Sequence, residues 1–305
     1  MRVLGVLVLI ACCAGLCTTA AWIATAPQGE FLPGDPRLAG PGDIRRGEQI
    51  FTAADCSSCH ATPGQTDRLH LGGGLALAST FGTFRPPNIS ADPIDGIGNW
   101  DVSDLANALV AGISPTGAHY YPAFPYTSYT SMTPGDIRDL HAYLRTVPWV
   151  KGRAPPHHPS LLFAIRRSVG AWKLLFFSKG RSAAPPAKAD KLLARGYYLV
   201  ETLAHCAECH SSRNVVGAII PETRFAGGID PQGTGYVPNI TAARIADWSE
   251  EDLVRMLTTG ETPNHGRVGS SMSDVVENTA RLPESDREAI AHYIKTLGAI
   301  PSPRP

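Results

Sequence analysis

Two short stretches of the chain combine a pair of cysteines with a histidine. Residues 56–60 read CSSCH and residues 206–210 read CAECH. Two thiols separated by two residues can each add to one vinyl group of a haem, and the histidine that follows then lies under the iron. The spacing therefore predicts two covalently bound haem c groups. The expected thioether anchors are Cys56, Cys59, Cys206 and Cys209, and the expected proximal iron ligands are His60 and His210.

Two other kinds of site use a similar cysteine pair. A zinc knuckle needs four ligands in matched pairs, and a thioredoxin-like redox pair needs a βαβ setting. Neither pattern is found around residues 56–60 or 206–210. The second copy of the motif, in matching surroundings, favours haem over both alternatives.

The residue on the second axial side of each iron decides between an electron carrier and a catalyst. Methionine sulfur stabilises Fe(II) and raises the reduction potential, whereas an open face binds small molecules. In the second half the candidate is Met272, which lies 12 residues beyond Gly260 in a segment expected to be a loop. Met256 is a poorer candidate because it falls inside a predicted helix.

The first half lacks a methionine at the matching place. A count of 12 residues beyond Gly112 arrives at Phe124, which cannot bind iron. Two donors lie nearby, Met132 and His119. Met132 aligns with Leu282, so its alternative role is an apolar residue packed just before a helix, and the alternative for His119 is an exposed loop histidine. We take Met132 as the predicted ligand, with His119 or an open face as alternatives.

Amphipathic segments near each motif are the helices expected to position it. In the first half these segments are residues 42–55, 101–112 and 133–147. Capping residues stand at their starts, and Gly112 closes the second one. The turns at residues 87–89 and 238–240, both PNI, are expected to present a backbone carbonyl to the proximal histidine N–H of their half, although a plain turn is the alternative.

The second half of the chain repeats these features at an offset near 150 residues. The matched pairs are Cys56 with Cys206, Gly73 with Gly227, Pro87 with Pro238, Trp100 with Trp248, Gly112 with Gly260, and Tyr143 with Tyr293. Self-similarity at a fixed spacing indicates duplication. We therefore predict a mostly α fold with two haem domains in tandem, residues 42–150 and residues 189–305.

The N-terminal segment, residues 1–41, is predicted to be a membrane anchor followed by a linker. Residues 3–29 carry no charge, which is long enough to span a bilayer. A cleaved signal peptide or a lipoprotein box ending at Cys12 are the alternatives. With Arg2 held inside, the remainder is placed outside the cytoplasmic membrane. We expect an inner-membrane protein with its haem domains in the periplasm.

Residues 151–188 are predicted to link the two haem domains through an amphipathic helix. The apolar residues expected on one face are Leu161, Leu162, Ile165, Val169, Trp172, Leu175 and Phe176. Such a stripe most often packs into a core, here as a strap across both domains. A basic amphipathic helix lying on a membrane surface is the alternative.

The overall composition limits the possible partners. Lys and Arg together number 27, as do Asp and Glu, so the formal net charge is zero. No field of the whole molecule draws the chain to nucleic acid, and we expect no nucleic-acid partner. The 30 glycines and 26 prolines suit long loops that wrap a cofactor.

The order of these motifs resembles the class I cytochromes c in cytochrome subunits of membrane-bound bacterial dehydrogenases, such as alcohol and gluconate dehydrogenases. The resemblance covers about residues 42–300 and is carried by LGGGLALASTFGTFRPPNISADPIDGIGNW and YYPAFPYTSYTSMT. Those subunits usually carry three haems, whereas this chain has two motifs, as in stand-alone di-haem relatives. Phe124 stands where such subunits commonly have methionine in a PAMPY-like phrase.

We therefore expect an electron-transfer protein. The resemblance implies that single electrons pass from a periplasmic dehydrogenase or quinol-linked donor to another cytochrome or a terminal oxidase. The alternative is a di-haem redox enzyme, a peroxidase or a thiosulfate-oxidising cytochrome, with an open face on the first haem. Phe124 is the residue that favours this alternative.

Overall fold

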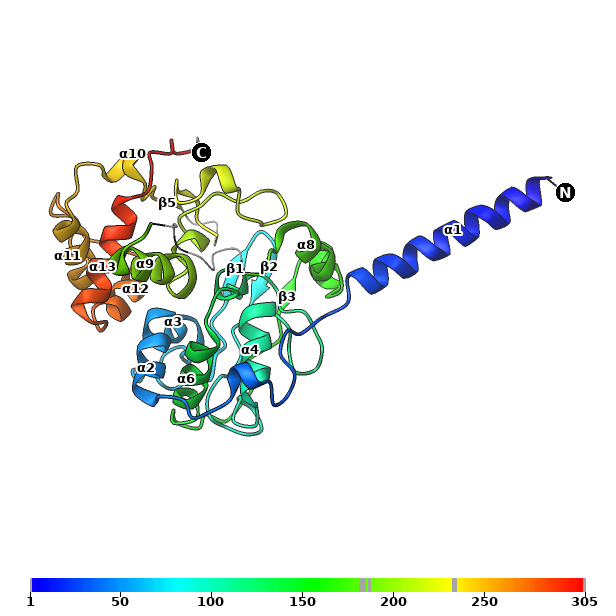
Figure 1. Ribbon diagram of the computed structural model, residues 1–305, viewed down its shortest axis with the longest axis horizontal. Coiled ribbons are helices and arrows are strands. Elements are labelled where there is room, and N and C mark those ends of the chain that lie inside the picture. The colour runs from blue at the N-terminus through cyan, green and yellow to red at the C-terminus, as the bar shows by residue number, and fades with distance from the viewer. Residues whose placement is uncertain (1, 181–184, 186–187, 232–234, 304–305) are drawn as a thin grey trace.

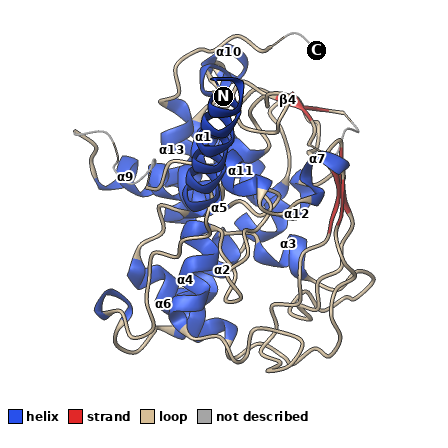
Figure 2. Ribbon diagram, turned by 90° about the vertical axis from the view of Figure 1, so that its right-hand side faces the viewer, coloured by secondary structure: helices blue, strands red, loops and turns tan. Residues whose placement is uncertain are grey.

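The computed structural model describes the chain except residues 1, 181–184, 186–187, 232–234 and 304–305. Within described helices, the side chains of Arg2, Val3, Val8 and Leu162 are not described. Parts of the predicted linker 151–188, and the predicted placement of the Arg2 and Leu162 side chains, therefore lie outside the described residues. The rest of the chain is mostly helix and long loops, with two small sheets (Figure 2).

Helix α1, Arg2–Ala24, extends away from the body of the molecule as an isolated rod (Figure 1). Its stretch Leu4–Ala24 has a mean hydropathy of 2.3 and none of it is buried. Among the described residues, α1 is the helix long and apolar enough to cross a membrane. A membrane anchor and a signal sequence both fit this composition.

In the N-terminal half of the body, residues 42–150, helices surround the first CxxCH motif. The helices are α2 (Ile44–Ala53), α3 (Cys56–His60), α4 (Val102–Ala111), α5 (Tyr126–Tyr129) and α6 (Pro134–Leu144), and the short η1 (Pro36–Leu38) precedes them. The predicted capping residues are confirmed: Asp101 forms a capping box with Asp104, Gly112 closes α4 at φ 60°, and the Thr133 side chain accepts from the Asp136 N–H. Local sequence therefore defines where these helices begin and end.

The C-terminal half, residues 189–305, has a similar order of elements. They are α9 (Lys191–Tyr198), the π-helical turn η2 (Leu199–Leu203), η3 (Cys206–Glu208), η4 (Pro221–Thr223), α10 (Ala242–Ile245), α11 (Glu250–Thr259), α12 (Met272–Thr279) and α13 (Glu284–Lys295). One prediction is wrong here, because Met272 begins helix α12 and does not lie in a loop. Burial of Val276 and Thr279 on one face of α12 explains why the segment is helical.

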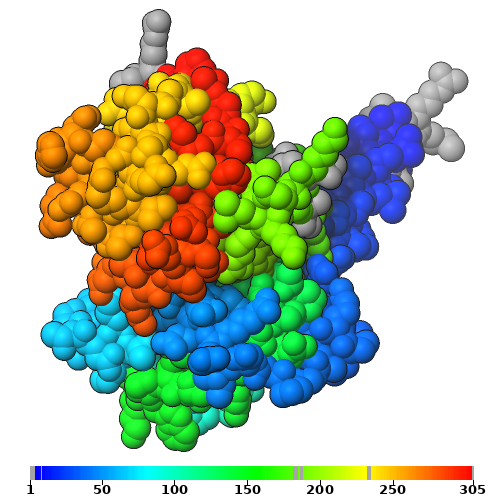
Figure 3. Space-filling view, turned by 60° about the vertical axis from the view of Figure 1, so that its left-hand side comes forward, coloured from blue at the N-terminus to red at the C-terminus, as the bar shows by residue number. Residues whose placement is uncertain are grey.

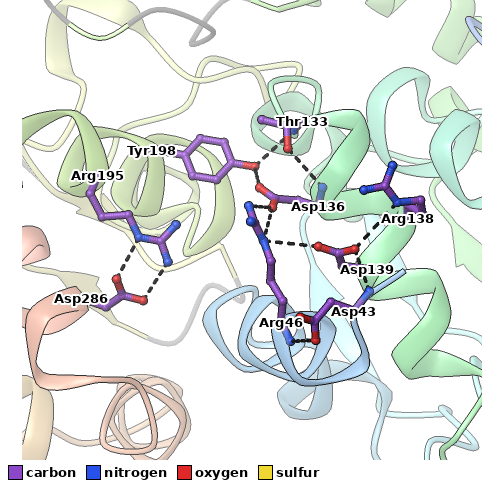
Figure 4. Close-up of polar contacts among 9 residues, drawn as sticks. All are labelled: Asp43, Arg46, Thr133, Asp136, Arg138, Asp139, Arg195, Tyr198 and Asp286. Carbon is purple, nitrogen blue, oxygen red and sulfur yellow. Dashed lines mark hydrogen bonds and ion pairs between the residues drawn. The ribbon is translucent and has the colours of Figure 1, made fainter. Parts of the chain in front are cut away.

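In each half, the first and last helices cross at a glycine. An added Cβ at Gly47 in α2 would overlap the Asp139 carbonyl oxygen of α6, and one at Gly196 in α9 would overlap the Ala289 carbonyl oxygen of α13. An arginine one residue earlier joins the same helices, with Arg46 to Asp136 at 2.6 Å and Arg195 to Asp286 at 2.8 Å (Figure 4). Both helix pairs therefore pack backbone to backbone.

In the described part of the chain, the strands are short and lie in the long segments between helices. Strands β1 (Leu77–Ser79), β2 (Gly82–Phe84) and β3 (His158–Pro159) form an antiparallel sheet in which Leu77 pairs with Phe84 and Thr83 with His158. Strands β4 (Gly228–Ile229) and β5 (Tyr236–Val237) form a second antiparallel pair.

The segment predicted as one long amphipathic helix is broken into two. Helix α7 covers Leu161–Ala164 and α8 covers Ser168–Phe176. The chain turns between them because Arg166 and Arg167 bind distant backbone carbonyls, those of His119 and Trp22. The predicted apolar face is therefore wrong in part, since Leu161, Ile165 and Leu175 are exposed while Val169, Trp172 and Phe163 are buried.

Helix α8 nevertheless joins the two halves, as the strap prediction required. The Lys173 ammonium donates to the carbonyls of Ala111 and Gly112 at 2.6 and 2.8 Å, and the Trp172 indole N–H donates to the Val216 carbonyl at 2.9 Å. The strap prediction is confirmed for α8.

The two halves pack directly against each other. Figure 3 shows the C-terminal half, yellow to red, seated on the N-terminal half, blue to green. One buried hydrophobic cluster includes Phe51, Leu140, Leu203 and Ile290, so it crosses from one half to the other. Tyr198 of α9 also crosses, because its hydroxyl donates to Asp136 of α6 at 2.5 Å (Figure 4).

Candidate haem-binding sites

The first CxxCH motif is a single helical turn that follows α2. Asp55, the residue before Cys56, has φ 52° and reverses the chain between α2 and α3. The imidazole Nδ1 of His60 lies 2.8 Å from the backbone carbonyl oxygen of Pro87. A carbonyl only accepts, so Nδ1 carries the proton and Nε2 keeps its lone pair. Nε2 is therefore the nitrogen available to bind a metal.

The second motif has the same arrangement. His205, the residue before Cys206, has φ 39°, and the Nδ1 of His210 lies 2.8 Å from the carbonyl oxygen of Pro238. The predicted use of both PN turns is confirmed. A carbonyl in this position orients the ring and increases the basicity of the other nitrogen, as outer partners of metal-bound histidines do.

The asparagine of each PN turn fixes the carbonyl that precedes it. Asn88 donates to the Val150 carbonyl at 2.6 Å and accepts from the Ser90 N–H at 2.9 Å. Asn239 donates to the Ile300 carbonyl at 2.8 Å and accepts from the Thr241 N–H at 2.7 Å. Both asparagines are buried. Each turn is therefore tied to the segment that follows the last helix of its half.

Glycine is required beside each PN turn. Gly73, at φ 69°, donates its N–H to the His60 carbonyl at 2.8 Å, and a Cβ there would lie 2.5 Å from the Pro87 oxygen. Gly227, at φ 81°, donates to the His210 carbonyl at 2.9 Å, and a Cβ would lie 2.6 Å from the Val237 oxygen. A side chain at either position would displace the turn that holds the histidine.

Burial keeps the motif residues uncharged. Burial lowers the pKa of His60 to about 4 and lowers the pKa of His210, so both rings are neutral at pH 7. Burial, reinforced by nearby Asp55, raises the pKa of the Cys59 thiol to about 12. The four motif cysteines and both histidines retain some accessible surface. Neutral rings and accessible thiols suit a cofactor that inserts beside them.

The candidate sixth ligands lie in different environments. Met272 is partly buried against the main hydrophobic cluster. Met132 is 5% exposed and lies just before α6, and Leu282 is also 5% exposed just before α13. The Nε2 of His119 lies 3.0 Å from the carbonyl oxygen of Thr25. Phe124 packs edge-on against Tyr120 at 5.6 Å between ring centroids.

The two CxxCH motifs approach each other. Desolvation is the main cause of the raised pKa of the Cys59 thiol, and Cys209 of the other motif also contributes to it, while Asp55, beside the first motif, contributes to the raised pKa of the Cys209 thiol. Tyr129 of α5 connects the motifs, since its hydroxyl donates to the Ala54 carbonyl at 2.9 Å and its ring lies 5.5 Å from that of His205. Two cofactors attached at these motifs would therefore be neighbours.

Each motif is also contacted by the opposite half. Glu208, inside the second motif, accepts from Thr127 at 2.5 Å and from Ser128 at 3.2 Å, both in α5. Asn278 of α12 donates to Ser58, inside the first motif, at 3.2 Å, and also to Asp55. Ser128 and Asn278 are separated by 150 positions, as are Ser58 and Glu208. The contacts across the two halves are reciprocal.

The donor atoms of each CxxCH motif fit haem c better than a zinc knuckle or a thioredoxin-like redox pair. Each motif offers two thiols and one imidazole with a free nitrogen, and a haem iron needs one protein nitrogen on its proximal side. No cluster of three or more His, Cys, Asp or Glu side chains that could hold a metal ion occurs in the described part of the chain. The motifs follow helical segments, and no βαβ unit surrounds them in the described ranges.

Several residues around the motifs were not identified from the sequence. Asp55, Tyr129, Glu208 and Asn278 contribute through contacts between distant segments. The offset of 150 residues could have identified Glu208 and Asn278, because their counterparts Ser58 and Ser128 stand at matched positions. Nothing in the local sequence distinguishes Tyr129 from the tyrosines beside it.

Comparisons with known proteins agree with this geometry. The sequence model of the cytochrome c family, described as "Cytochrome c", matches residues 44–148. The chain is 46% identical over 298 residues to a "Diheme cytochrome c-type" protein of Cereibacter sphaeroides, covering 96% of each chain. It is 36% identical to the fructose dehydrogenase cytochrome subunit of Gluconobacter japonicus, over 87% of this chain and 54% of that protein.

A further relative is the gluconate 2-dehydrogenase cytochrome c subunit of Pantoea cypripedii, which is 32% identical over 84% of this chain and 60% of that protein. The chain thus spans little more than half the length of these two dehydrogenase subunits. Family membership supports covalently bound haem c. On its CxxCH geometry and these similarities, the chain belongs to the cytochrome c family.

Proposed function

We propose that the chain is a di-haem c-type cytochrome that carries single electrons. The observation that carries this proposal is that the histidines of both CxxCH motifs have Nδ1 held by a proline carbonyl at 2.8 Å. Each Nε2 is then oriented and left free. Haem c supplies one-electron Fe(III)/Fe(II) chemistry when bound, and the role of the chain is to hold, orient and bury two of these groups.

The residues proposed to hold the haems are those of the motifs. Cys56, Cys59, Cys206 and Cys209 are the covalent anchors, and His60 and His210 are the proximal ligands. We further propose Met272 as the sixth ligand of the second haem and Met132 as that of the first.

The two haem-binding halves are proposed to be tandem copies, residues 42–150 and 189–305, joined by residues 151–188. Matched contacts support this proposal, because the proline carbonyl, the turn asparagine, the crossing glycine and the helix-joining arginine all recur about 150 positions later. Independent origins would not reproduce all four.

The electron donor is proposed to be a periplasmic dehydrogenase or a quinol-linked protein, and the acceptor a downstream respiratory cytochrome or oxidase. The names of relatives from Gluconobacter japonicus and Pantoea cypripedii, cytochrome subunits of fructose and gluconate dehydrogenases, support such a donor. Helix α1 would hold the protein in the inner membrane with both halves in the periplasm, as its apolar composition suits.

A second candidate function is that of a di-haem redox enzyme with an open face on the first haem. Phe124 occupies the position matching Met272, Met132 is as buried as Leu282, and His119 is bonded to Thr25. Each of these observations favours an open face over a sixth protein ligand.

Absorption and EPR spectra of the purified protein, with a reductive titration, test the proposal. A carrier is expected to show two low-spin haems and to take up two electrons per chain. Met132→Ala should then convert the first haem alone to a high-spin form, and Met272→Ala the second alone. A high-spin haem that binds cyanide before any substitution would favour the enzyme, and uptake of fewer than two electrons would contradict the di-haem proposal.

A further inference from the structure

The outer faces of α7 and α8 are apolar although they face away from the body. The exposed residues are Leu161 and Ala164 on α7, Ile165 directly after it in extended conformation, and Ala171, Leu174 and Leu175 on α8. The α8 set follows the i, i+3, i+4 spacing of a single helical face. The exposed fractions are 92% for Leu161, 71% for Ile165, 61% for Leu174 and 76% for Leu175. These six residues are called the α7–α8 face below.

The polarity of α8 is the reverse of that of an ordinary surface helix. Its inner face buries the charged Lys173 beside Val169 and Trp172, and its outer face presents two leucines. Single exposed apolar side chains are normal in proteins, but several of them on two successive helices indicate an interaction surface. The inner face is already used for the strap contacts, so the outer face is available for another partner.

Helix α8 lies where α1 leaves the body. Figure 1 shows α8 at the base of the α1 rod. The guanidinium of Arg167 lies 4.2 Å from the centre of the Trp22 ring, and its Nε donates to Thr25 at 3.2 Å. Trp22 and Ile23, at the end of α1, are themselves 64% and 62% exposed. The exposed apolar end of α1 therefore lies beside Arg167, the residue that precedes α8.

The charge of this region identifies which partner fits. Residues 140–189 contain nine Lys and Arg and no Asp or Glu, although the whole chain has zero formal net charge. Arg166 and Arg167 lie between α7 and α8, and Lys179 lies after α8, where its Nζ is 3.9 Å from the Glu30 carboxylate. Leucines on a helix face with cations at its edges are the composition of segments that lie in an interface with anionic phospholipid, and a tryptophan at the end of a spanning helix sits at headgroup depth.

We infer that the α7–α8 face lies in the outer interface of the bilayer beside α1, so that the haem-bearing halves are docked on the membrane in one orientation. The inference rests on the proposal that α1 is a retained membrane anchor. Two attachments, one spanning and one lying flat, remove the rotation about α1 that a single anchor would leave. The lipid partner is an anionic phospholipid surface.

Photocrosslinking in the full-length holoprotein tests this contact. Leu175 is replaced by p-benzoylphenylalanine, and the protein is reconstituted in liposomes of phosphatidylcholine and phosphatidylglycerol. The matched control carries the same reporter at Glu251, exposed on α11, which lies across the body from α1 (Figures 1 and 3). We expect lipid adducts at position 175 to exceed those at position 251 about tenfold, as burial of one leucine in lipid predicts.

A charged variant provides the second measurement. Ile165→Glu with Leu174→Glu, in the chain with the reporter at position 175, should lower lipid adducts about tenfold or more. The haem absorption spectrum should not change, because both positions are on the outer face. Equal adducts at positions 175 and 251, or adducts at position 175 to a second copy or to another protein, would overturn the inference.

The mass of the purified intact chain separates this inference from the anchor proposal. If α1 is retained and position 175 gives no lipid adduct, the surface inference fails and the anchor stands. If α1 has been removed and position 175 still reacts with lipid, the anchor fails and the surface contact stands.

Discussion

At the scale of single residues, the hydrogen bond between each proximal histidine and its proline carbonyl is the most informative contact. It selects the tautomer, leaves Nε2 free for the iron of the proposed haem and makes that nitrogen a stronger donor. The glycine next to each turn allows the approach, because Gly73 and Gly227 both have positive φ and contact the turn backbone. Substitution of Gly73 or Gly227 should therefore weaken the hydrogen bond that orients the histidine of the same half, and through it the binding of iron by that histidine.

We predict that Gly73→Ala destabilises the holoprotein by about 2 kcal/mol more than Gly74→Ala does. Both glycines have positive φ, but a Cβ at Gly74 would meet only Pro155, at 3.7 Å, whereas one at Gly73 would overlap the Pro86 and Pro87 oxygens. Weakening of the His60 hydrogen bond should also raise the reduction potential of the first haem alone. Guanidinium denaturation and a redox titration measure both effects. Equal losses of stability with unchanged potentials would contradict this prediction.

At the scale of elements, two crossings of helices hold the motifs in place. Gly47 of α2 and Gly196 of α9 lie where each helix touches the last helix of its half. Helix propensity alone favours alanine over glycine by about 1 kcal/mol. At these crossings the close approach outweighs propensity, because an added Cβ would overlap a carbonyl oxygen.

We predict that Gly47→Ala and Gly196→Ala each lower the free energy of unfolding by about 3 kcal/mol, since the crossing helices must separate. Gly135→Ala is the control, because Gly135 lies in α6 and its nearest neighbour would be 3.8 Å from a new Cβ. That variant should be neutral or stabilising by up to about 1 kcal/mol. Chemical denaturation, monitored through the haem absorbance, measures the free energy of unfolding of all three variants. A loss in Gly135→Ala as large as in the other two would show that the crossing is not the cause.

Helix α8 gives the stability a pH dependence through Lys173. Burial lowers the pKa of Lys173 to about 7, whereas an unfolded lysine has a pKa near 10.4. Between pH 7 and 10 the unfolded chain binds more protons, so stability must rise with pH. We predict a gain of about 2 kcal/mol from pH 7 to pH 9 relative to Lys173→Met. Urea denaturation at both pH values measures the gain, and the same pH slope in both proteins would contradict it.

At the scale of the whole molecule, the two halves complete each other. Asn278 of the second half donates to Asp55 and Ser58 of the first, and Ser128 of the first half donates to Glu208 of the second. These contacts lie at the motifs themselves. The interface would therefore determine how close two haems bound at these motifs are to each other.

We predict that Asn278→Ala lowers the free energy of unfolding by about 2 kcal/mol, because the Asn278 side chain is buried and the partly buried Asp55 and Ser58 each lose a donor. Asn99→Ala is the matched control, since Asn99 makes one exposed hydrogen bond to the Pro93 carbonyl at 2.9 Å. That variant should change stability by less than about 0.5 kcal/mol. Chemical denaturation compares the two. If Asn278→Ala and Asn99→Ala lower the free energy of unfolding by the same amount, the contact between the halves does not contribute to stability.

Much of this structure could be predicted from the sequence where its causes are local. The two CxxCH motifs, the caps at Asp101 and Thr133 and the glycine end of α4 depend on neighbouring residues alone. The proline carbonyls were predicted because the ligand chemistry requires such a partner. Features that depend on contacts between distant segments were either not predicted or predicted wrongly. Arg166 and Arg167 break the linker helix through contacts with His119 and Trp22, and packing makes Met272 the first residue of α12.

The central claim is that each half of this chain holds one covalently attached haem through its CxxCH motif. Mass spectrometry of the intact protein, matured in a host that attaches haem c, measures this directly. We predict an increase of two haem masses, and of one haem mass when Cys206→Ala and Cys209→Ala are combined. An intact chain that carries no haem or a single one, or that binds zinc through these thiols, would contradict it.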